Sequence, residues 1–202
     1  MSGRRQAAHR PLLQECKGRI ASSEDRDGRR WALDSPREGC LGTDGQNRYN
    51  DAMKKLVPKE FDVPAVLETA SFRLRMLTVN DVVKDYDAVM SSLEHLQRQN
   101  VFGDTWPRST LTLEQDLIDL GWHQKEFQTR RSFTYTVMNL DESVCLGCVY
   151  IEPSKRPEAE AEIYLWVRQS EYEKGTDPVL FAAVKSWIAE VWPFNTVDYP
   201  GR

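Results

Sequence analysis

A glycine between a buried strand and an amphipathic helix is the feature of this chain best suited to chemistry. Residues 161–167 form an apolar run typical of a strand, and a helical pattern begins near Asp177, with Gly175 in the connection. Backbone N–H groups of such a connection converge at the helix N-terminus, where the helix dipole favours negative charge. The sequence therefore predicts a binding site for a phosphate-bearing ligand around Gly175.

The segment Cys145-Leu-Gly-Cys148 is a C-x-x-C pattern, which occurs in metal and redox sites. In an extended strand, residues three apart point to opposite faces, so the two thiols are expected to diverge. Neither a second cysteine pair nor a nearby histidine completes a zinc site. We therefore predict two small buried side chains and no metal. The four cysteines do not form the pattern of a disulfide framework, and a reducing cytoplasm suits them.

Two histidines are further candidates for a site. His95 falls at the end of an expected helix, where it could line a substrate cleft. His123 follows Trp122 in the next expected helix, where a surface position is predicted. Neither has a spaced Cys, Asp or His partner that indicates a metal site. A structural role is the simpler interpretation of both.

The composition narrows the class of protein. The chain has 202 residues, of which 40% are hydrophobic, enough to build a core. A net charge of −4 argues against a general nucleic-acid binder, and no apolar run of about 18 residues is present to span a membrane. Arg4 and Arg5 are not followed by the apolar segment of a secretory leader. We expect a cytoplasmic protein without nucleic-acid or membrane partners.

Residues 1–52 differ in composition from the rest of the chain. They contain six of the eleven glycines and only eight residues that are Val, Ile, Leu, Met, Phe, Trp or Tyr. So little apolar surface cannot offset the entropy of folding. We therefore predict a disordered N-terminal extension over 1–52 and one folded domain over 53–202. An upstream start codon or an authentic tail would each explain such an extension.

Two helices are expected after the first strand of this domain. Residues 72–76 alternate apolar and basic side chains, as in a strand with one buried face. Asn80 is then expected to cap a helix, and Thr112 with Gln115 forms a capping box for a second one. The predicted apolar faces are Val82, Tyr86, Val89, Met90 and Leu93 in the first helix, and Leu113, Leu117, Leu120 and Phe127 in the second.

The second half of the domain is expected to complete a mixed sheet. Residues 133–138 and 144–151 are predicted antiparallel strands joined at Asp141-Glu-Ser143, and the buried strand described above follows them. A helix over 177–191 and a short strand over 196–199 come last. The predicted order is β-α-α-β-β-β-α-β, an α/β architecture with a mixed α+β sheet. The side chains expected to point inward from the last helix are Leu180, Phe181, Val184, Trp187, Ile188 and Val191.

This order, with a strand, a glycine loop and a helix near its end, resembles the GNAT superfamily of acyl-CoA N-acyltransferases over residues 72–199. Small bacterial GNAT-like proteins begin near the position of Met53. They carry segments similar to Asp81-Val-Val-Lys-Asp-Tyr-Asp-Ala88, Cys145-Leu-Gly-Cys-Val-Tyr150, Trp166-Val-Arg168, Trp192-Pro-Phe194 and Tyr199-Pro-Gly-Arg202. The resemblance implies a GNAT-like acyl-CoA N-acyltransferase fold.

The resemblance also implies an activity. GNAT enzymes transfer an acetyl group from acetyl-CoA to an amine, which here would belong to a small molecule or a protein. A backbone N–H on the fourth strand of the family orients the thioester, and its counterpart here would be at Trp166, Val167 or Arg168. The residues that would hold the phosphates are Lys174, Gly175 and Thr176.

Acyl transfer further needs a base that accepts the proton of the amine, often a glutamate. One candidate is Glu162, which shares a strand face with Tyr164 and Trp166. The other is Glu152, at the end of the preceding strand. Each glutamate would otherwise be a solvated charge at the edge of the fold.

Departures from the family pattern leave a second interpretation open. The GNAT loop pattern R/Q-x-x-G-x-G/A falls on Tyr172-Glu-Lys-Gly175-Thr-Asp177, of which only the glycine is retained. The Asp177 carboxylate would satisfy the N–H groups that a pyrophosphate binds and would repel phosphate, with Lys174 offsetting part of this; alternatively, Asp177 is simply a helix cap. Family members continue beyond the position of Arg202, so a second copy could complete the sheet in a homodimer. The alternative to catalysis is a non-catalytic GNAT-like binding or dimerisation module.

Overall fold

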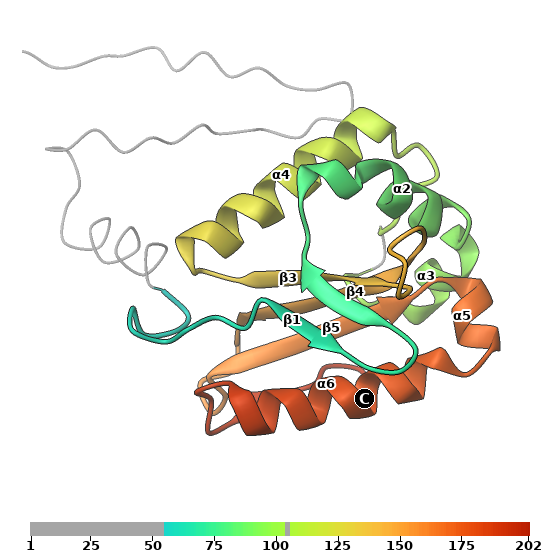
Figure 1. Ribbon diagram of the computed structural model, residues 1–202. Helices are drawn as coiled ribbons and strands as arrows, with labels where there is room; N and C mark the ends of the chain where they lie inside the picture. The colour runs from blue at the N-terminus through green and yellow to red at the C-terminus, as the bar shows by residue number, and fades with distance from the viewer. Residues whose placement is uncertain (1–54, 104–105) are drawn as a thin grey trace, which may run out of the picture. The chain divides into compact units, whose positions relative to one another are not determined.

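A computed structural model describes residues 55–103 and 106–202, and the extension predicted over 1–52 lies outside the described residues. Six strands form one sheet in the order β1-β2-β3-β4-β5-β6, in which β6 runs parallel to β5 and the other neighbours are antiparallel (Figure 1). The strands are β1 Val66–Glu68, β2 Arg73–Met76, β3 Phe133–Met138, β4 Cys145–Pro153, β5 Ala161–Val167 and β6 Val197–Asp198. The helices are η1 Val79–Asp81, a 3-10 turn, and α2 Val82–Met90, α3 Leu93–Gln99, α4 Leu113–Thr129, α5 Gln169–Glu173 and α6 Thr176–Val191.

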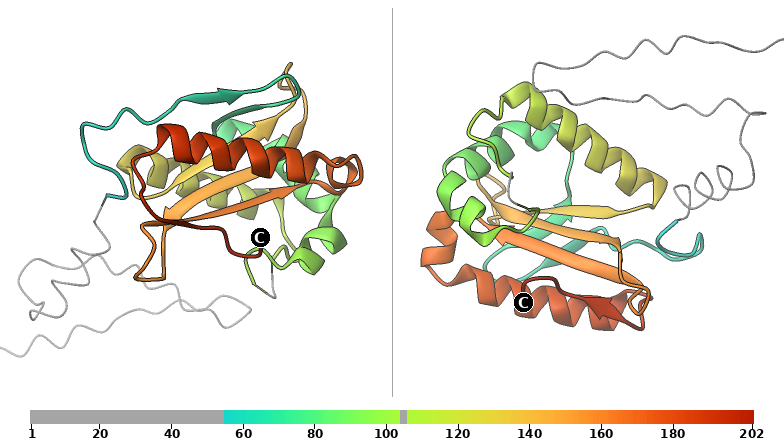
Figure 2. Two further views of the ribbon diagram at one scale, coloured as in Figure 1. Left: turned by 90° about the horizontal axis from the view of Figure 1, so that it is seen from below. Right: turned by 180° about the vertical axis from the view of Figure 1, so that it is seen from behind.

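Helices cover both faces of the sheet, with α6 on one side and α2, α3 and α4 on the other (Figures 1 and 2). On the first side, α6 buries Leu180, Val184 and Ile188 against Val149 and Ile163 of the sheet. The opposite side is a smaller cluster, and it contains Ala88, Val89, Leu96, Met138, Cys145, Cys148, Tyr150 and Trp166. Alternate residues of β4 and β5 thus serve two separate cores.

The predicted α/β architecture with its mixed sheet is confirmed. β3 and β5 have the predicted bounds, and β4 and α6 begin and end within two residues of those predicted. Three elements were not predicted, one of them the η1 turn before α2. β1 adds an edge strand, and the short helix α5 occupies the connection for which the sequence predicts an open loop.

The first predicted helix is interrupted in the structure. α2 ends at Met90 and α3 starts at Leu93, because Ser92 leaves the helical conformation with φ −123° and ψ 16°. The hydroxyl of Ser92 accepts a hydrogen bond from the Gln169 N–H at 2.9 Å, which ties the break to the start of α5. The predicted cap at Asn80 is wrong, since Thr78 caps the η1 turn that leads into α2.

A β-bulge brings both cysteines of the C-x-x-C pattern to the same face. The pairing of β3 with β4 shifts between Val137, opposite Gly147, and Met138, opposite Cys145. Leu146 is the extra residue, so the two-residue alternation is broken once between Cys145 and Cys148. The prediction that the thiols diverge is therefore wrong.

We expect replacement of Gly147 by Ala to destabilise the fold strongly. A Cβ at Gly147 would lie 2.0 Å from the Trp166 carbonyl oxygen, so the β4–β5 pair would have to shift. The expected loss is about 3 kcal/mol of unfolding free energy, at the upper end for overpacking, measured by denaturant unfolding. Gly121→Ala on α4 is the control. Its Cβ would meet only Val79 Cγ1 at 3.7 Å, so that variant should be neutral or more stable; equal stability of the two variants would contradict the close approach.

The pairing of β5 with β6 is short. Only Ala161 with Val197 and Glu162 with Asp198 form pairs, and β6 then ends. β6 therefore does not pair with the second half of β5. Within residues 55–103 and 106–202, none of the helices is both long and apolar enough to cross a membrane.

Candidate active site

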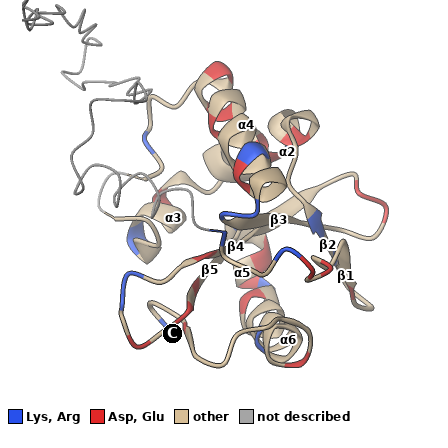
Figure 3. Ribbon diagram, turned by 90° about the vertical axis from the view of Figure 1, so that its left-hand side faces the viewer, with Lys and Arg blue, Asp and Glu red and all other residues tan. Residues whose placement is uncertain are grey.

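A cavity of about 220 Å³ lies on the face of the sheet that α2 and α4 cover. We call it the acidic pocket, because four carboxylates line it, from α2, α4 and β4. Asp and Glu positions along α2 and α4 can be followed in Figure 3. Its lining consists of Leu77, Asp85, Val89, Phe102, Trp106, Leu111, Asp116, Asp119, Leu120, Trp122, His123, Tyr150 and Glu152.

The sequence of α4 places a polar stripe over this pocket. Asp116, Leu120 and His123 follow each other at spacings of four and three, so they share one helix face. The capping box of Thr112 with Gln115 is confirmed. The predicted apolar face is partly wrong, since Leu113 and Leu117 are 44% and 41% exposed. A helix that borders a polar cavity has no continuous apolar stripe. The spacing of apolar residues along α4 therefore predicts the wrong face of this helix as the buried one.

Asp116 is a buried carboxyl without a hydrogen-bond partner for one of its oxygens. Its side chain is 5% exposed, and Oδ2 contacts no donor among the described residues. Burial, followed by the charges of Asp85 and Asp119, raises the pKa of Asp116 to about 7. The group is therefore poised to ionise when a cation enters the pocket.

This raised pKa predicts a pH dependence of stability. The carboxyl of an unfolded chain releases its proton near pH 4, whereas folded Asp116 holds it until about pH 7. The stabilisation from Asp116 is thus present at low pH and is lost as the pH rises. Relative to Asp116→Asn, the wild type should lose roughly 2 kcal/mol between pH 5 and pH 8, measured by chemical denaturation. A constant difference between the two chains would contradict the buried, unpaired carboxyl.

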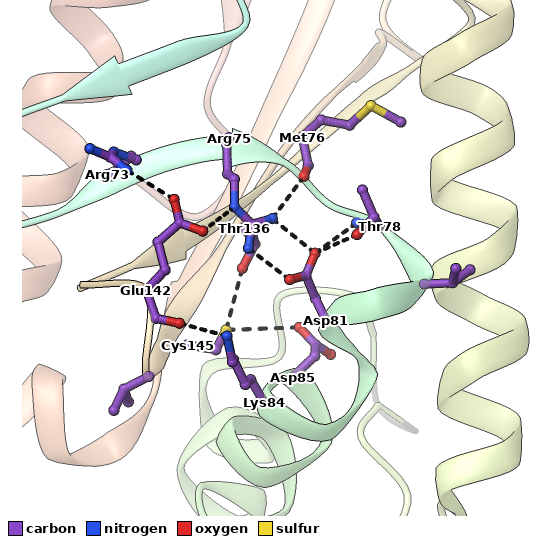
Figure 4. Close-up of polar contacts among 12 residues, drawn as sticks. Arg73, Arg75, Met76, Thr78, Asp81, Lys84, Asp85, Thr136, Glu142 and Cys145 are labelled. Atoms are coloured by element: carbon purple, nitrogen blue, oxygen red, sulfur yellow. Dashed lines mark hydrogen bonds and ion pairs between the residues drawn. The ribbon is translucent and has the colours of Figure 1, made fainter. Parts of the chain in front are cut away.

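Asp85 lies beside the two cysteines at the base of the pocket. The Cys148 Sγ donates to Asp85 Oδ1 at 3.3 Å. The Cys145 Sγ lies 4.0 Å from the same oxygen (Figure 4). Burial raises the pKa of Asp85 to about 6. The three side chains place their donor atoms within 4.8 Å of one another. A structural zinc site takes four ligands, and among the described residues this group supplies three.

An ion-pair network holds the start of α2, and thereby Asp85, against the sheet. Arg75 on β2 contacts Asp81 at 2.8 Å and Glu142 at 2.7 Å (Figure 4). Although burial raises the pKa of Asp81, hydrogen bonds from Arg75 and Thr78 bring it below its ordinary value. Asp81 therefore stays ionised and fixes the helix that carries Asp85 one turn later.

The surface position predicted for His123 is wrong, whereas His95 has the structural role favoured for it. His123 lines the pocket instead of the surface, with Nδ1 3.2 Å from Thr134 Oγ1 and its ring 5.3 Å from that of Tyr150. Burial lowers the pKa of His123 to about 4, so its imidazole is neutral at physiological pH and is a weak base. His95 is buried away from this pocket and packs against the ring of Tyr172 at 4.6 Å.

The two candidate bases lie opposite each other on β4 and β5, but only one of them lines the pocket. Glu152 does so, and burial, with the nearby charge of Glu162, raises its pKa. Glu162 is buried, and other side chains contact its carboxylate. The Tyr164 hydroxyl donates to it at 2.9 Å, and the Lys155 ammonium lies 3.3 Å away. Glu152 is the glutamate that a ligand in the acidic pocket could reach.

The groups near Gly175 that were expected to donate hydrogen bonds to a phosphate already donate to other residues of the same loop. Gly175 has the left-handed conformation with φ 81°, and its N–H donates to the Tyr172 carbonyl at 3.0 Å. The other two donors, Lys174 Nζ and Thr176 Oγ1, both donate to the Glu171 carboxylate, at 2.6 Å and 2.9 Å. A phosphate at this corner would have to compete with these contacts.

A second cavity, of about 380 Å³, opens between β5, the N-terminus of α6 and the segment after β6. Asp177 is 6% exposed there, and the guanidinium of Arg202 binds both of its carboxylate oxygens, at 2.5 and 2.8 Å. Arg202 also lies 3.5 Å from the Leu165 carbonyl of β5. We call this space the β5–β6 gap; one side of it is occupied by the Arg202–Asp177 pair.

Comparison with solved structures identifies the architecture. The chain is similar to a ribosomal-protein-S5-alanine acetyltransferase from Vibrio fischeri, with 16% identity, a TM-score of 0.50, and coverage of 63% of this chain and 67% of that one. It is also similar to a probable acetyltransferase, with 15% identity, a TM-score of 0.51, and coverage of 66% and 72%. The fold is that of the GNAT acetyltransferases.

A further structure with this fold is a ribosomal L7/L12 alpha-N-protein acetyltransferase in complex with coenzyme A. It shares 15% identity, with a TM-score of 0.48 and coverage of 61% of this chain and 67% of that one. No protein-family model and no curated protein matches the sequence. At these identities the likeness concerns the GNAT fold, and the chemistry has to be argued from the site.

In this GNAT fold, one of the three expected thioester-orienting amides points to the edge of β5 that faces away from β4. The Arg168 N–H donates to the Leu146 carbonyl of β4 at 2.8 Å. Because N–H groups alternate in direction along a strand, the Trp166 N–H also points to β4, whereas the Val167 N–H points the other way. β6 ends before it reaches Val167. Of the three, Val167 is therefore the amide directed away from β4, toward the edge of β5 that β6 leaves unpaired, whereas the β5 residue that lines the gap itself is Leu165.

Proposed function

We propose that the chain is an N-acyltransferase that transfers an acetyl group from acetyl-CoA to the amine of a small molecule. The observation that carries this proposal is the arrangement on β4 and β5 of a GNAT fold. A pocket lined by Glu152 and His123 lies on one side of the strand pair, and the β5–β6 gap lies at the edge of β5, on the side to which the Val167 N–H is directed. The pocket volume, about 220 Å³, favours a small acceptor over a protein segment.

The proposed reaction assigns one role to each group. The amine attacks the thioester carbonyl, whose oxygen the Val167 N–H stabilises as negative charge develops. The nitrogen–carbon bond forms, the carbon–sulfur bond breaks, and the departing thiolate takes up a proton from solvent. Glu152 stays the proposed acceptor of the amine proton, and its raised pKa brings it closer to the pH at which a base works best. Because Glu152 pairs with Glu162, five residues before Val167, the proton would reach it through water molecules and not by direct contact.

The phosphates of acetyl-CoA would lie at the N-terminus of α6. Lys174, Gly175 and Thr176 stay proposed ligands, and they would have to exchange their contacts with Glu171 and Tyr172 for the phosphates. Arg202 is a further ligand that sequence reasoning did not propose. Its guanidinium suits bidentate binding of phosphate as well as of carboxylate.

One observation favours a non-catalytic module as the second candidate. The Arg202–Asp177 pair occupies part of the gap that acetyl-CoA would enter, and a buried carboxylate at a helix N-terminus opposes a phosphate. Such a chain would retain the acidic pocket and would not bind acetyl-CoA.

Calorimetric titration of the full chain with acetyl-CoA separates the two candidates. The enzyme proposal predicts saturable binding of one acetyl-CoA, competed by desulfo-coenzyme A. Absence of heat at millimolar acetyl-CoA, from a chain whose thermal unfolding shows that it is folded, would leave the non-catalytic module.

A further inference from the structure

We propose that the acidic pocket binds a small diammonium compound, with one cationic group held by Asp116 and Asp85 and the other near Glu152. This inference names the acceptor class within the proposed function, on which it rests for its biological role. Binding alone tests it, without acetyl-CoA. It does not follow from the fold, because it depends on side chains particular to this pocket.

The first argument is an unsatisfied group. Asp116 is buried and lines the pocket, and its Oδ2 has no hydrogen-bond partner among the described residues. A buried polar atom without a partner is costly, and its usual partner is a protein donor, a water or a ligand. An ammonium group has three donors and a positive charge, so it would satisfy Asp116 Oδ2 and compensate the charge of the carboxylate.

The second argument is that the carboxylates fall into two sets. Asp85 accepts a hydrogen bond from Cys148 of β4 and lines the pocket with Asp116 and Asp119, and its charge acts on Asp116. Glu152 lies four residues further along β4, roughly 13 Å from Cys148 at the usual rise per residue of a strand. Two separate acidic ends match a ligand with two cationic groups better than a ligand with one.

The third argument is the apolar middle of the pocket. Phe102 packs edge-on against Tyr150 at 4.8 Å and against Trp106 at 5.0 Å, and all three rings line the cavity. These rings would cover an alkyl chain, and their faces attract ammonium groups that approach them. A volume of about 220 Å³ is below the range of roughly 300–1,000 Å³ for drug-sized ligands, so the chain between the two cations is short.

Calorimetry with 1,5-diaminopentane, 1-aminopentane and 1,5-pentanediol tests the proposal on the full chain. The diamine should bind at least tenfold more tightly than the monoamine, and the diol should not bind. Shorter and longer diamines then define the spacing of the two ends. Equal affinity of diamine and monoamine, or no binding of either, would overturn the proposal. Failure of acetyl-CoA to bind in a separate titration would affect only the proposed function.

Matched variants on α4 locate the site. Asp116→Asn keeps the shape of the side chain and should abolish the advantage of the diamine over the monoamine. Glu114→Gln removes an exposed carboxylate two residues earlier, on another side of the helix, and should leave this advantage intact. Thermal unfolding separates binding from structure, because Asp116→Asn removes an unpaired buried carboxyl and should not lower Tm. A diamine advantage that survives in Asp116→Asn, or that is lost equally in Glu114→Gln, would contradict the assignment.

Discussion

Replacement of Glu152 by Gln is expected to lower kcat for acetyl transfer by about 100- to 10,000-fold, the range for loss of a general base. The glutamine side chain keeps the size and polarity of glutamate but cannot take up the proton of the amine. Glu152 lines the acidic pocket, and burial raises its pKa. A wild-type pH profile should therefore rise as Glu152 deprotonates, and the variant should lack this rise.

Two control variants make the Glu152 result specific. Glu162→Gln changes the opposite residue on β5, which Tyr164 and Lys155 already bind, so its main effect should be on stability. His123→Gln changes the other proton acceptor in the pocket, whose pKa is about 4. If the Glu152 variant kept its activity and its pH profile while the His123 variant lost both, His123 would be the base.

Replacement of Asp177 by Asn is expected to strengthen binding of acetyl-CoA by about tenfold, the scale of charge effects at a helix terminus. The substitution removes a negative charge from the N-terminus of α6 and releases the guanidinium of Arg202. Both changes favour phosphate. The measurement is calorimetric titration of wild type and variant with acetyl-CoA at two ionic strengths, since a charge effect should weaken with salt.

Arg202→Ala provides the opposite test at the same corner. It would leave the Asp177 carboxylate buried and unpaired at the place proposed for the phosphates, so affinity should fall at least tenfold. Asp177→Gly should bind acetyl-CoA about as tightly as Asp177→Asn does, because both substitutions remove the negative charge. Equal affinity of wild type, the Asp177 variants and Arg202→Ala would show that acetyl-CoA does not bind against α6.

Much of the fold could be predicted from local patterns. β3 and β5 have the predicted bounds because their residues are apolar or β-branched with the single exception of Glu162. The capping box at Thr112 gave the start of α4 for a similar reason, since a cap is a local hydrogen-bond pattern. The α5 helix could not be predicted, because its contacts with Ser92 and His95 come from residues far away in the sequence.

The candidate site was predicted only in part, for physical reasons. Glu152 was a candidate because it follows a strand, but its burial depends on α4 packing across the sheet. Asp116 was missed because an acid inside an amphipathic helix is ordinarily a solvated residue. The nearness of Asp85 to Cys145 depends on a β-bulge, whose one extra residue reverses the direction of a side chain.

The central claim is that acetyl-CoA enters the β5–β6 gap, and a crystal structure of the full chain at saturating acetyl-CoA tests it most directly. We predict the thioester oxygen within hydrogen-bond distance of the Val167 N–H, with Arg202 turned from Asp177 to a phosphate. A structure with an empty gap, and with the Arg202–Asp177 pair intact at that concentration, would contradict it.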